Sequence, residues 1–231
     1  MQALLRAADG FTGRANSALA IGAPGLPPPE AVQEVCAWYR ARGLPPMIAV
    51  PFPMTGPDDS PVDRLLDSLG WPLRQAPAVV MTAPPPQVPA GNRAGPPTAV
   101  TVTTAPDDEW LAMYPLPRGR PAAHRPRLLL SAPWQAFASV REAGQTIAIG
   151  RVAGDEDWAG LTAIETHPGH RRRGLATAVS TALAAAAADR GVTGVYLQVE
   201  RENTGARVLS GGIGFCDHHR YHYRVAPAAA S

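Results

Sequence analysis

Apolar residues fall into short runs of two kinds, separated by proline, glycine and polar residues. In the first third of the chain, some runs are continuous or alternating, as in strands, and others have helical spacing. Val32, Val35 and Tyr39 have the helical spacing, with prolines before them and Gly43 after them, as is usual at helix ends. The predicted elements are strand Ser17–Ile21, a helix from Pro28 to Gly43, strand Met47–Phe52, helix Val62–Leu69 and strand Ala76–Thr82.

A second series of predicted elements begins after residues 84–97. The prolines of that segment have no amide hydrogen to donate within a helix or a central strand. The longest helix of the second series is Ala-rich and stops at Gly191. Antiparallel strands followed by strand–helix–strand–helix–strand predict a mixed α+β fold. The elements are strand Ala99–Thr104, a helix from Pro106, a short helix near Arg127–Ala132, strands Gln135–Arg141, Thr146–Ala153 and Trp158–Thr166, helix Leu175–Arg190, strand Val195–Val199, helix Asn203–Gly211 and strand Asp217–Val225.

The interruption at residues 84–97 predicts a linker between a unit at 1–83 and a larger unit at 98–225, with 226–231 a frayed tail. The composition of the 231 residues, 45% hydrophobic and 17% charged, is sufficient for a buried core. All 21 basic residues are arginine, and the net charge of +2 is too small to argue for nucleic-acid binding. No membrane span, signal peptide or disulfide pattern is found, so we expect a soluble cytoplasmic protein.

The stretch from Thr162 to Thr177 carries the most specific chemistry. A strand ends at a Pro-Gly turn, and a loop of arginines and small residues enters the longest predicted helix. The first amides of a helix have no partners within it and lie at the positive end of its dipole. Gly174 and Ala176 leave the backbone accessible, and the neighbouring arginines add positive charge. This pattern favours the binding of a pyrophosphate.

Two motifs follow one another in the order strand, loop, helix, strand, helix. The first is Arg-x-x-Gly-x-Ala, and the second is an Asn-x-x-Ala helix that ends in Gly-Phe. Their residues are Arg171, Gly174 and Ala176, then Asn203, Ala206, Gly214 and Phe215. With these motifs, residues 98–225 resemble the GNAT family of N-acetyltransferases.

The resemblance implies the GNAT acyl-CoA N-acyltransferase fold, with acetyl-CoA between the fourth and fifth strands. It implies direct transfer of the acetyl group to a primary amine on an acceptor that the sequence does not identify. The backbone of one strand end is expected to pair with pantetheine, the helix entry to hold the pyrophosphate, and an asparagine to lie near the pantetheine or the thiol. The corresponding residues are Ile164, Glu165, Thr166, Arg171, Arg172, Arg173, Gly174, Leu175, Ala176, Thr177 and Asn203.

The acid and base of the reaction depart from the family pattern. Where GNAT enzymes often have a tyrosine that protonates the thiolate, this chain has Ser210. The base of related histone acetyltransferases aligns near Gly160, which has no side chain. Glu165 is the nearest acid on the strand, and Asp157 stands near its beginning. We therefore take Glu165 as the candidate base and Ser210 as the residue at the acid position. A non-catalytic acyl-CoA-binding or regulatory module is the alternative.

The first unit resembles the second half of a degenerate GNAT repeat, as in two-part actinobacterial GNAT proteins. Leu26–Ala31 replaces the arginine-glycine loop, and its prolines remove amide donors. We expect this copy not to bind coenzyme A and to be structural or to shape the acceptor cleft. The matching segments are Ala20–Gly25 with Ala163–Gly169, Ala41–Leu44 with Asp189–Val192, and Leu69–Trp71 with Ile213–Phe215.

Other chemistry is less well supported. On a strand, His218 and His222 share a face, but two histidines make a poor zinc site, and no metal is expected. Tyr221 or Tyr223 remains an alternative proton donor. The arginines at 171–173 favour phosphate over nucleic acid because they lie at a helix entry. The sequence is compatible with a homodimer but does not establish the oligomeric state.

Overall fold

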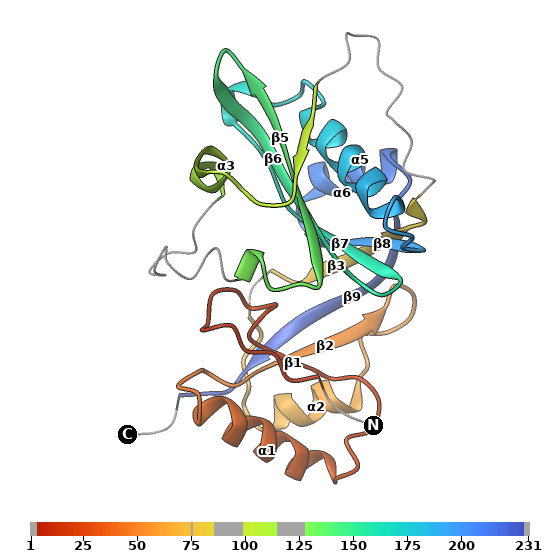
Figure 1. Cartoon of the computed structure of the whole chain (residues 1–231). Helices are drawn as coiled ribbons and strands as arrows, with labels where there is room; N and C mark the ends of the chain where they lie inside the picture. The colour runs from red at the N-terminus through yellow and green to blue at the C-terminus, as the bar shows by residue number, and fades with distance from the viewer. Residues whose placement is uncertain (1–3, 75, 86–98, 115–127, 229–231) are drawn as a thin grey trace.

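The computed structural model describes residues 4–74, 76–85, 99–114 and 128–228. It forms one nine-stranded sheet in the order β1-β2-β9-β3-β8-β7-β6-β5-β4 (Figure 1). The strands are β1 (Ala18–Leu19), β2 (Met47–Pro53), β3 (Ala78–Ala83), β4 (Thr101–Thr103), β5 (Trp134–Glu142), β6 (Gln145–Asp155), β7 (Trp158–Thr166), β8 (Gly194–Glu200) and β9 (Cys216–Val225). The helices are α1 (Pro28–Arg40), α2 (Pro61–Ser68), α3 (Asp108–Met113), α5 (Leu175–Ala188) and α6 (Thr204–Gly212), with a 3₁₀ turn at Pro168–His170.

The mixed α+β class and the predicted elements in the described residues are confirmed, with shifts of a few residues at their ends. The largest difference is β1, which has two residues because the Ile21 amide bonds back to the carbonyl of Leu19 at 3.1 Å and does not continue the pairing with β2. The predicted linker at 84–97 and the short helix near 127–132 lie partly outside the described residues. No helix among the described residues is both long and apolar enough to cross a membrane.

Four helices pack on one face of the sheet. Phe52, Arg220 and Val79 are opposite one another on β2, β9 and β3, and so share a face. Phe52 belongs to the core under α1 and α2, and Val79 belongs to the core under α5 and α6. We call this side the helix face, and Figure 1 shows α5 and α6 over one part of the sheet and α1 and α2 by the other.

The opposite face carries two smaller apolar clusters. One contains Trp110 of α3 with Phe137 and Ile149, and the Trp110 indole donates to the carbonyl of Ala138 at 3.1 Å. The other contains Tyr221 and Tyr223 of β9. We call this side the open face, because between these clusters it carries cavities.

The strand order has an internal two-fold symmetry. Exchanging β1, β2 and β3 with β7, β8 and β9 turns the order β1-β2-β9-β3-β8-β7 into itself. In each half, a parallel pair is connected through a helix, and a second helix leads to a strand in the middle of the sheet. This arrangement agrees with the predicted degenerate repeat.

The two units are joined within the sheet, because strands of one unit pair with strands of the other. β3 pairs antiparallel with both β8 and β9, and β9 pairs with β2. β8 and β9 therefore do not contact each other as neighbours, although both belong to the unit predicted at 98–225. The sheet runs across the predicted boundary, because the first unit supplies a strand that separates β8 from β9.

Candidate functional site

The parallel strands β7 and β8 separate halfway along their length. Trp158 to Leu161 pair with Gly194 to Leu197, and no pairing follows beyond Leu161. At this point β7 has a bulge, because the four residues from Thr162 to Glu165 lie opposite the three residues from Ile149 to Arg151 on β6. Ala163 within the bulge has φ 55°, a conformation that is uncommon for residues other than glycine. The bulge turns the end of β7 away from β8.

A cleft of about 410 Å³ opens where the two strands separate. The His167 amide donates to Ile147 on β6, and because backbone groups alternate along a strand, those of Ile164 and Thr166 face away from β6. They form an unpaired strand edge of the type that an extended ligand can extend. The residues predicted for cofactor contact that line the cleft are Ile164, Glu165, Ala176 and Asn203, together with Ser210 from the acid position.

The loop into α5 exposes the first amides of that helix. Gly174 is the N-cap residue with φ 72°, and no side chain caps the helix at this end. Arg172 also has a positive φ of 60°. Arg171 and Arg172 are exposed, whereas Arg173 donates two hydrogen bonds to Glu142 of β5 at 2.9 and 2.6 Å. Two of the three predicted arginines are thus available to an anion, and the third is held by an ion pair.

The candidate catalytic residues lie in the cleft with different constraints. Burial raises the pKa of Glu165, and the charge of Arg171 opposes this shift. Ser210 is 3% exposed, and its hydroxyl donates to the carbonyl of Ala206 at 2.8 Å, so its proton is already engaged. Asn203 caps α6, and its Oδ1 accepts from the Ala206 amide at 3.0 Å. Glu165 has the environment of a base, and Ser210 lacks that of a ready proton donor.

Tyr196 does not line the cleft but lines a neighbouring cavity on the open face, and the sequence analysis did not single it out. Its ring lies over Gly160, where a Cβ would approach its hydroxyl oxygen to 2.8 Å. The position at which the base of related histone acetyltransferases is expected is therefore covered by a tyrosine from the neighbouring strand. The signal in the sequence was the glycine itself, which leaves room for a close approach.

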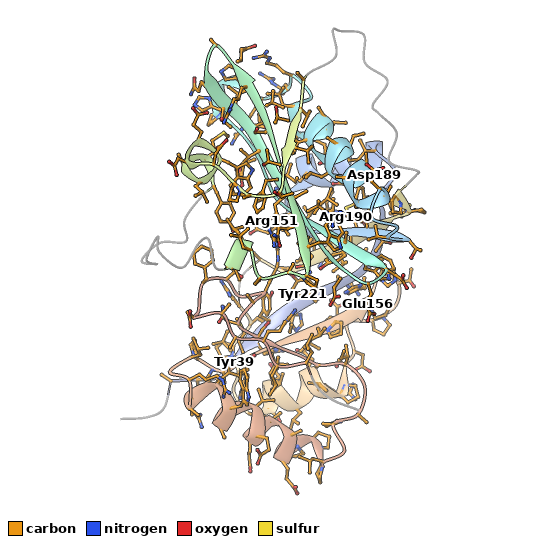
Figure 2. All side chains as sticks on the ribbon, in the orientation of Figure 1. Tyr39, Arg151, Glu156, Asp189, Arg190 and Tyr221 are labelled. Atoms are coloured by element: carbon orange, nitrogen blue, oxygen red, sulfur yellow. The ribbon has the colours of Figure 1, made fainter. Side chains whose placement is uncertain are left out.

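A second cavity of about 530 Å³ lies on the open face and adjoins the cleft through Leu161, Thr162 and Ala163 of β7. The N-terminal segment forms part of its wall, and Arg14 donates to the carbonyl of Gln198 on β8 at 3.3 Å. Neither Arg14 nor Gln198 belongs to a sequence motif. Their contact joins residues from distant parts of the chain, so no local pattern predicts it. Figure 2 shows Arg151 and Tyr221 in the middle of the molecule, between the parts that carry α5 and α1.

The first unit has a matching cleft of different character. It lies beside β1, β2 and the start of α1, and its volume is about 370 Å³. Its lining residues are apolar or small, and the prolines before α1 leave fewer amides for an anion than the N-terminus of α5 does. This difference supports the expectation that the first copy does not hold a pyrophosphate.

The histidines of β9 do not converge. His222 contacts Asp63 at 2.6 Å, and His218 contacts His219 at 2.9 Å between their Nδ1 atoms. No group of three metal-ligating side chains occurs in the part of the chain that the structure describes. Tyr221 donates to the Oε1 atom of Gln198 at 2.9 Å on the open face, and does not line the cleft.

A comparison with known protein families identifies the family of this chain. The family described as "Probable histone acetyltransferase Rv0428c C-terminal" matches residues 2–224. The chain belongs to this family. The Rv0428c C-terminal family thus covers both units of the predicted repeat and not the second alone.

Two curated relatives are similar to this Rv0428c-family chain. It is 31% identical over 238 residues to "Probable histone acetyltransferase Rv0428c" of Mycobacterium tuberculosis, covering 97% of this chain and 66% of that protein. It is 32% identical over 93 residues to "Uncharacterized N-acetyltransferase YobR" of Bacillus subtilis, covering 40% of this chain and 38% of that protein. The chain therefore spans less than two thirds of the length of either relative.

Solved structures show the GNAT fold for this Rv0428c-family chain. A "Tandem GNAT protein from the clavulanic acid biosynthesis pathway" aligns with a TM-score of 0.65 at 14% identity, covering 83% of this chain and 67% of that one. A "GCN5-related N-acetyltransferase from Kribbella flavida" aligns with a TM-score of 0.64 at 17% identity, covering 96% and 85%. The predicted GNAT fold and its tandem organisation are confirmed.

Proposed function

We propose that the protein is an acetyl-CoA-dependent N-acetyltransferase that transfers the acetyl group directly to a primary amine. The observation that carries this proposal is the joining of three features at one cleft: the separated strands β7 and β8, the free strand edge at Ile164 and Thr166, and the uncapped start of α5. These features suit an extended ligand with a pyrophosphate at one end.

In the proposed reaction, acetyl-CoA lies along β7 and the amine enters from the open-face cavity. The amine nitrogen forms a bond to the acetyl carbon, and the carbon–sulfur bond breaks to leave the coenzyme A thiolate. Glu165 is the candidate acceptor for the amine proton, because its raised pKa brings its basicity closer to that task. The thiolate takes a proton from water or from a hydroxyl other than Ser210, whose proton is engaged.

The first test is a calorimetric titration with acetyl-CoA, with free coenzyme A and ATP as comparisons. Micromolar binding of acetyl-CoA with little binding of ATP is expected, because the strand edge contacts pantetheine and not a nucleotide alone. Absence of binding at millimolar concentration would refute the proposal. Amines are then screened by release of the free thiol.

The engaged hydroxyl of Ser210 favours a second candidate function, that of a non-catalytic acyl-CoA-binding module. This candidate predicts tight acetyl-CoA binding with no thiol release above the rate in buffer for any amine. Thiol release that depends on an added amine would exclude it.

A further inference from the structure

Arg151 is a buried cation that forms no ion pair with an acid among the residues that the structure describes. It lies on β6 opposite Phe137 and Thr162, and so points to the open face. The residue is 9% exposed, and its Nε donates to the carbonyl of Leu129 at 2.9 Å. Among the described residues, no hydrogen bond and no carboxylate reaches its Nη1 or Nη2 atoms. The segments outside the description contain no aspartate or glutamate in the sequence, so their side chains supply no carboxylate either.

An unpaired buried charge is unfavourable, because it gives up hydration without gaining an ion pair. Burial lowers the pKa of Arg151, opposed only by interaction with Tyr114 and Tyr196. The Nη nitrogens are not among the polar atoms sealed without a partner, so they remain open to the cavity that Arg151 lines. A guanidinium held in this way has two parallel donors free for a ligand.

The surroundings of the cavity are positive. Arg6 and Arg14 line it together with Arg151, and Asp155 is the one carboxylate among the lining residues. Arg6 donates to the carbonyl and hydroxyl of Ser17 at 3.1 and 2.9 Å, and it forms no ion pair within the described part of the chain. A ligand in this cavity meets three guanidinium groups from two different segments of the chain.

We infer that the acceptor is a small amine that also bears a carboxylate, and that Arg151 binds this carboxylate in the open-face cavity. That the acceptor is an amine rests on the proposed function, whereas that it bears a carboxylate rests on the cavity alone. The cavity of about 530 Å³ has the size of a small-molecule site and adjoins the cleft, so the amine can approach the thioester while the acid end remains at Arg151. A peptide rich in lysine or arginine is disfavoured by the same charges.

The binding test uses product-like probes and needs no turnover. N-acetyl-L-phenylalanine and N-acetyl-L-phenylalaninamide, which differ at the carboxyl group alone, are titrated into the wild-type protein by calorimetry. The acid is expected to bind about tenfold to a hundredfold more tightly, the range for a hydrogen bond to a charged group. Equal affinity for the two probes, or no binding of either at millimolar concentration, would overturn the inference.

Arg151→Met is expected to abolish the preference for the acid, because methionine retains apolar volume and removes the charge. Replacing an unpaired buried charge by an apolar side chain is not expected to unfold the protein. Should Arg151→Met fail to fold, Arg14→Met replaces another arginine that lines the cavity, and this variant is expected to show a reduced preference for the acid. Arg42→Met is the matched control, since Arg42 stacks over Trp38 of α1 and does not line the cavity, and its variant should retain the full preference. Loss of the preference in the control alone would contradict the assignment.

A parallel assay separates this inference from the proposed function. Thiol release is measured with L-phenylalanine, with phenethylamine as the same amine without its carboxylate, and with a lysine-rich peptide. A higher kcat/KM for the amino acid than for phenethylamine, lost in Arg151→Met at unchanged acetyl-CoA affinity, supports both conclusions. A preference for phenethylamine or the peptide overturns the inference and leaves the transferase standing. Acid-selective probe binding without any acetyl-CoA binding overturns the transferase and leaves the carboxylate site.

Discussion

Gly174 at the entry of α5 allows a sharp test of the coenzyme site, because the same helix ends at a glycine of the same conformation. Gly174 has φ 72°, and Gly191 just after the helix has φ 79° with open space where a Cβ would lie. A side chain in this left-handed region costs about 1–2 kcal/mol. For a chain of this size, each kcal/mol lowers the unfolding midpoint by about 2–4 °C, so either Glu variant should melt about 2–8 °C lower.

The two variants should differ in coenzyme binding. In Gly174→Glu, a carboxylate lies where the first amides of α5 are offered to the pyrophosphate, and about two charge-assisted hydrogen bonds are lost. At about 1.5–3 kcal/mol each, the dissociation constant for acetyl-CoA should rise roughly 10²- to 10⁴-fold. In Gly191→Glu, the added charge meets the negative end of the dipole, so the control is destabilised at least as much. Its affinity should nevertheless be unchanged.

The assay is calorimetric titration with acetyl-CoA, well below both unfolding midpoints, after thermal denaturation of each variant. Unchanged affinity in Gly174→Glu would refute the placement of the pyrophosphate at α5. Equal losses in both variants would mean that helix stability, and not the loop, controls binding.

Three further predictions concern the base, the ion pair between α2 and β9, and the sheet. Glu165→Gln should lower kcat about 10²- to 10⁴-fold, and an unchanged rate would exclude Glu165 as the base. In the wild type, the acidic limb of kcat/KM should lie above the ordinary glutamate pKa of about 4.3, because burial raises the pKa of Glu165. Burial opposes the lowering of the pKa of Asp63, but hydrogen bonds from Arg224 and His222 outweigh it, so Asp63→Asn should cost about 3 kcal/mol at pH 7 by urea denaturation. This difference should shrink as the pH falls below about 4 and through the lower folded pKa, and a constant difference would contradict the pairing. Met81→Ala on buried β3 should cost about 2–5 kcal/mol and keep a single unfolding transition, whereas the exposed Val102→Ala changes little, and two separate transitions would show that the units fold independently.

The elements and the anion-binding loop could be predicted because their determinants are local. The helix over Leu175–Ala188 follows from alanine propensity and a glycine stop, and β7 has the bounds of its apolar run. The conformation at Gly174 follows from the place of a glycine between a Pro-Gly turn and a helix. Each of these features depends on residues within a few positions of one another, so the sequence alone suffices for them.

Contacts between distant segments were decided by the tertiary structure. The insertion of β3 between β8 and β9 depends on pairing between strands more than a hundred residues apart, which apolar periodicity does not specify. The same holds for Tyr196 over Gly160, for the Arg14 contact with Gln198, and for the lack of an acid beside Arg151 among the described residues. The sequence by itself determined the elements and the loop that suits a pyrophosphate. The tertiary structure determined which side chains surround the acceptor, because that cavity is assembled from both ends of the chain.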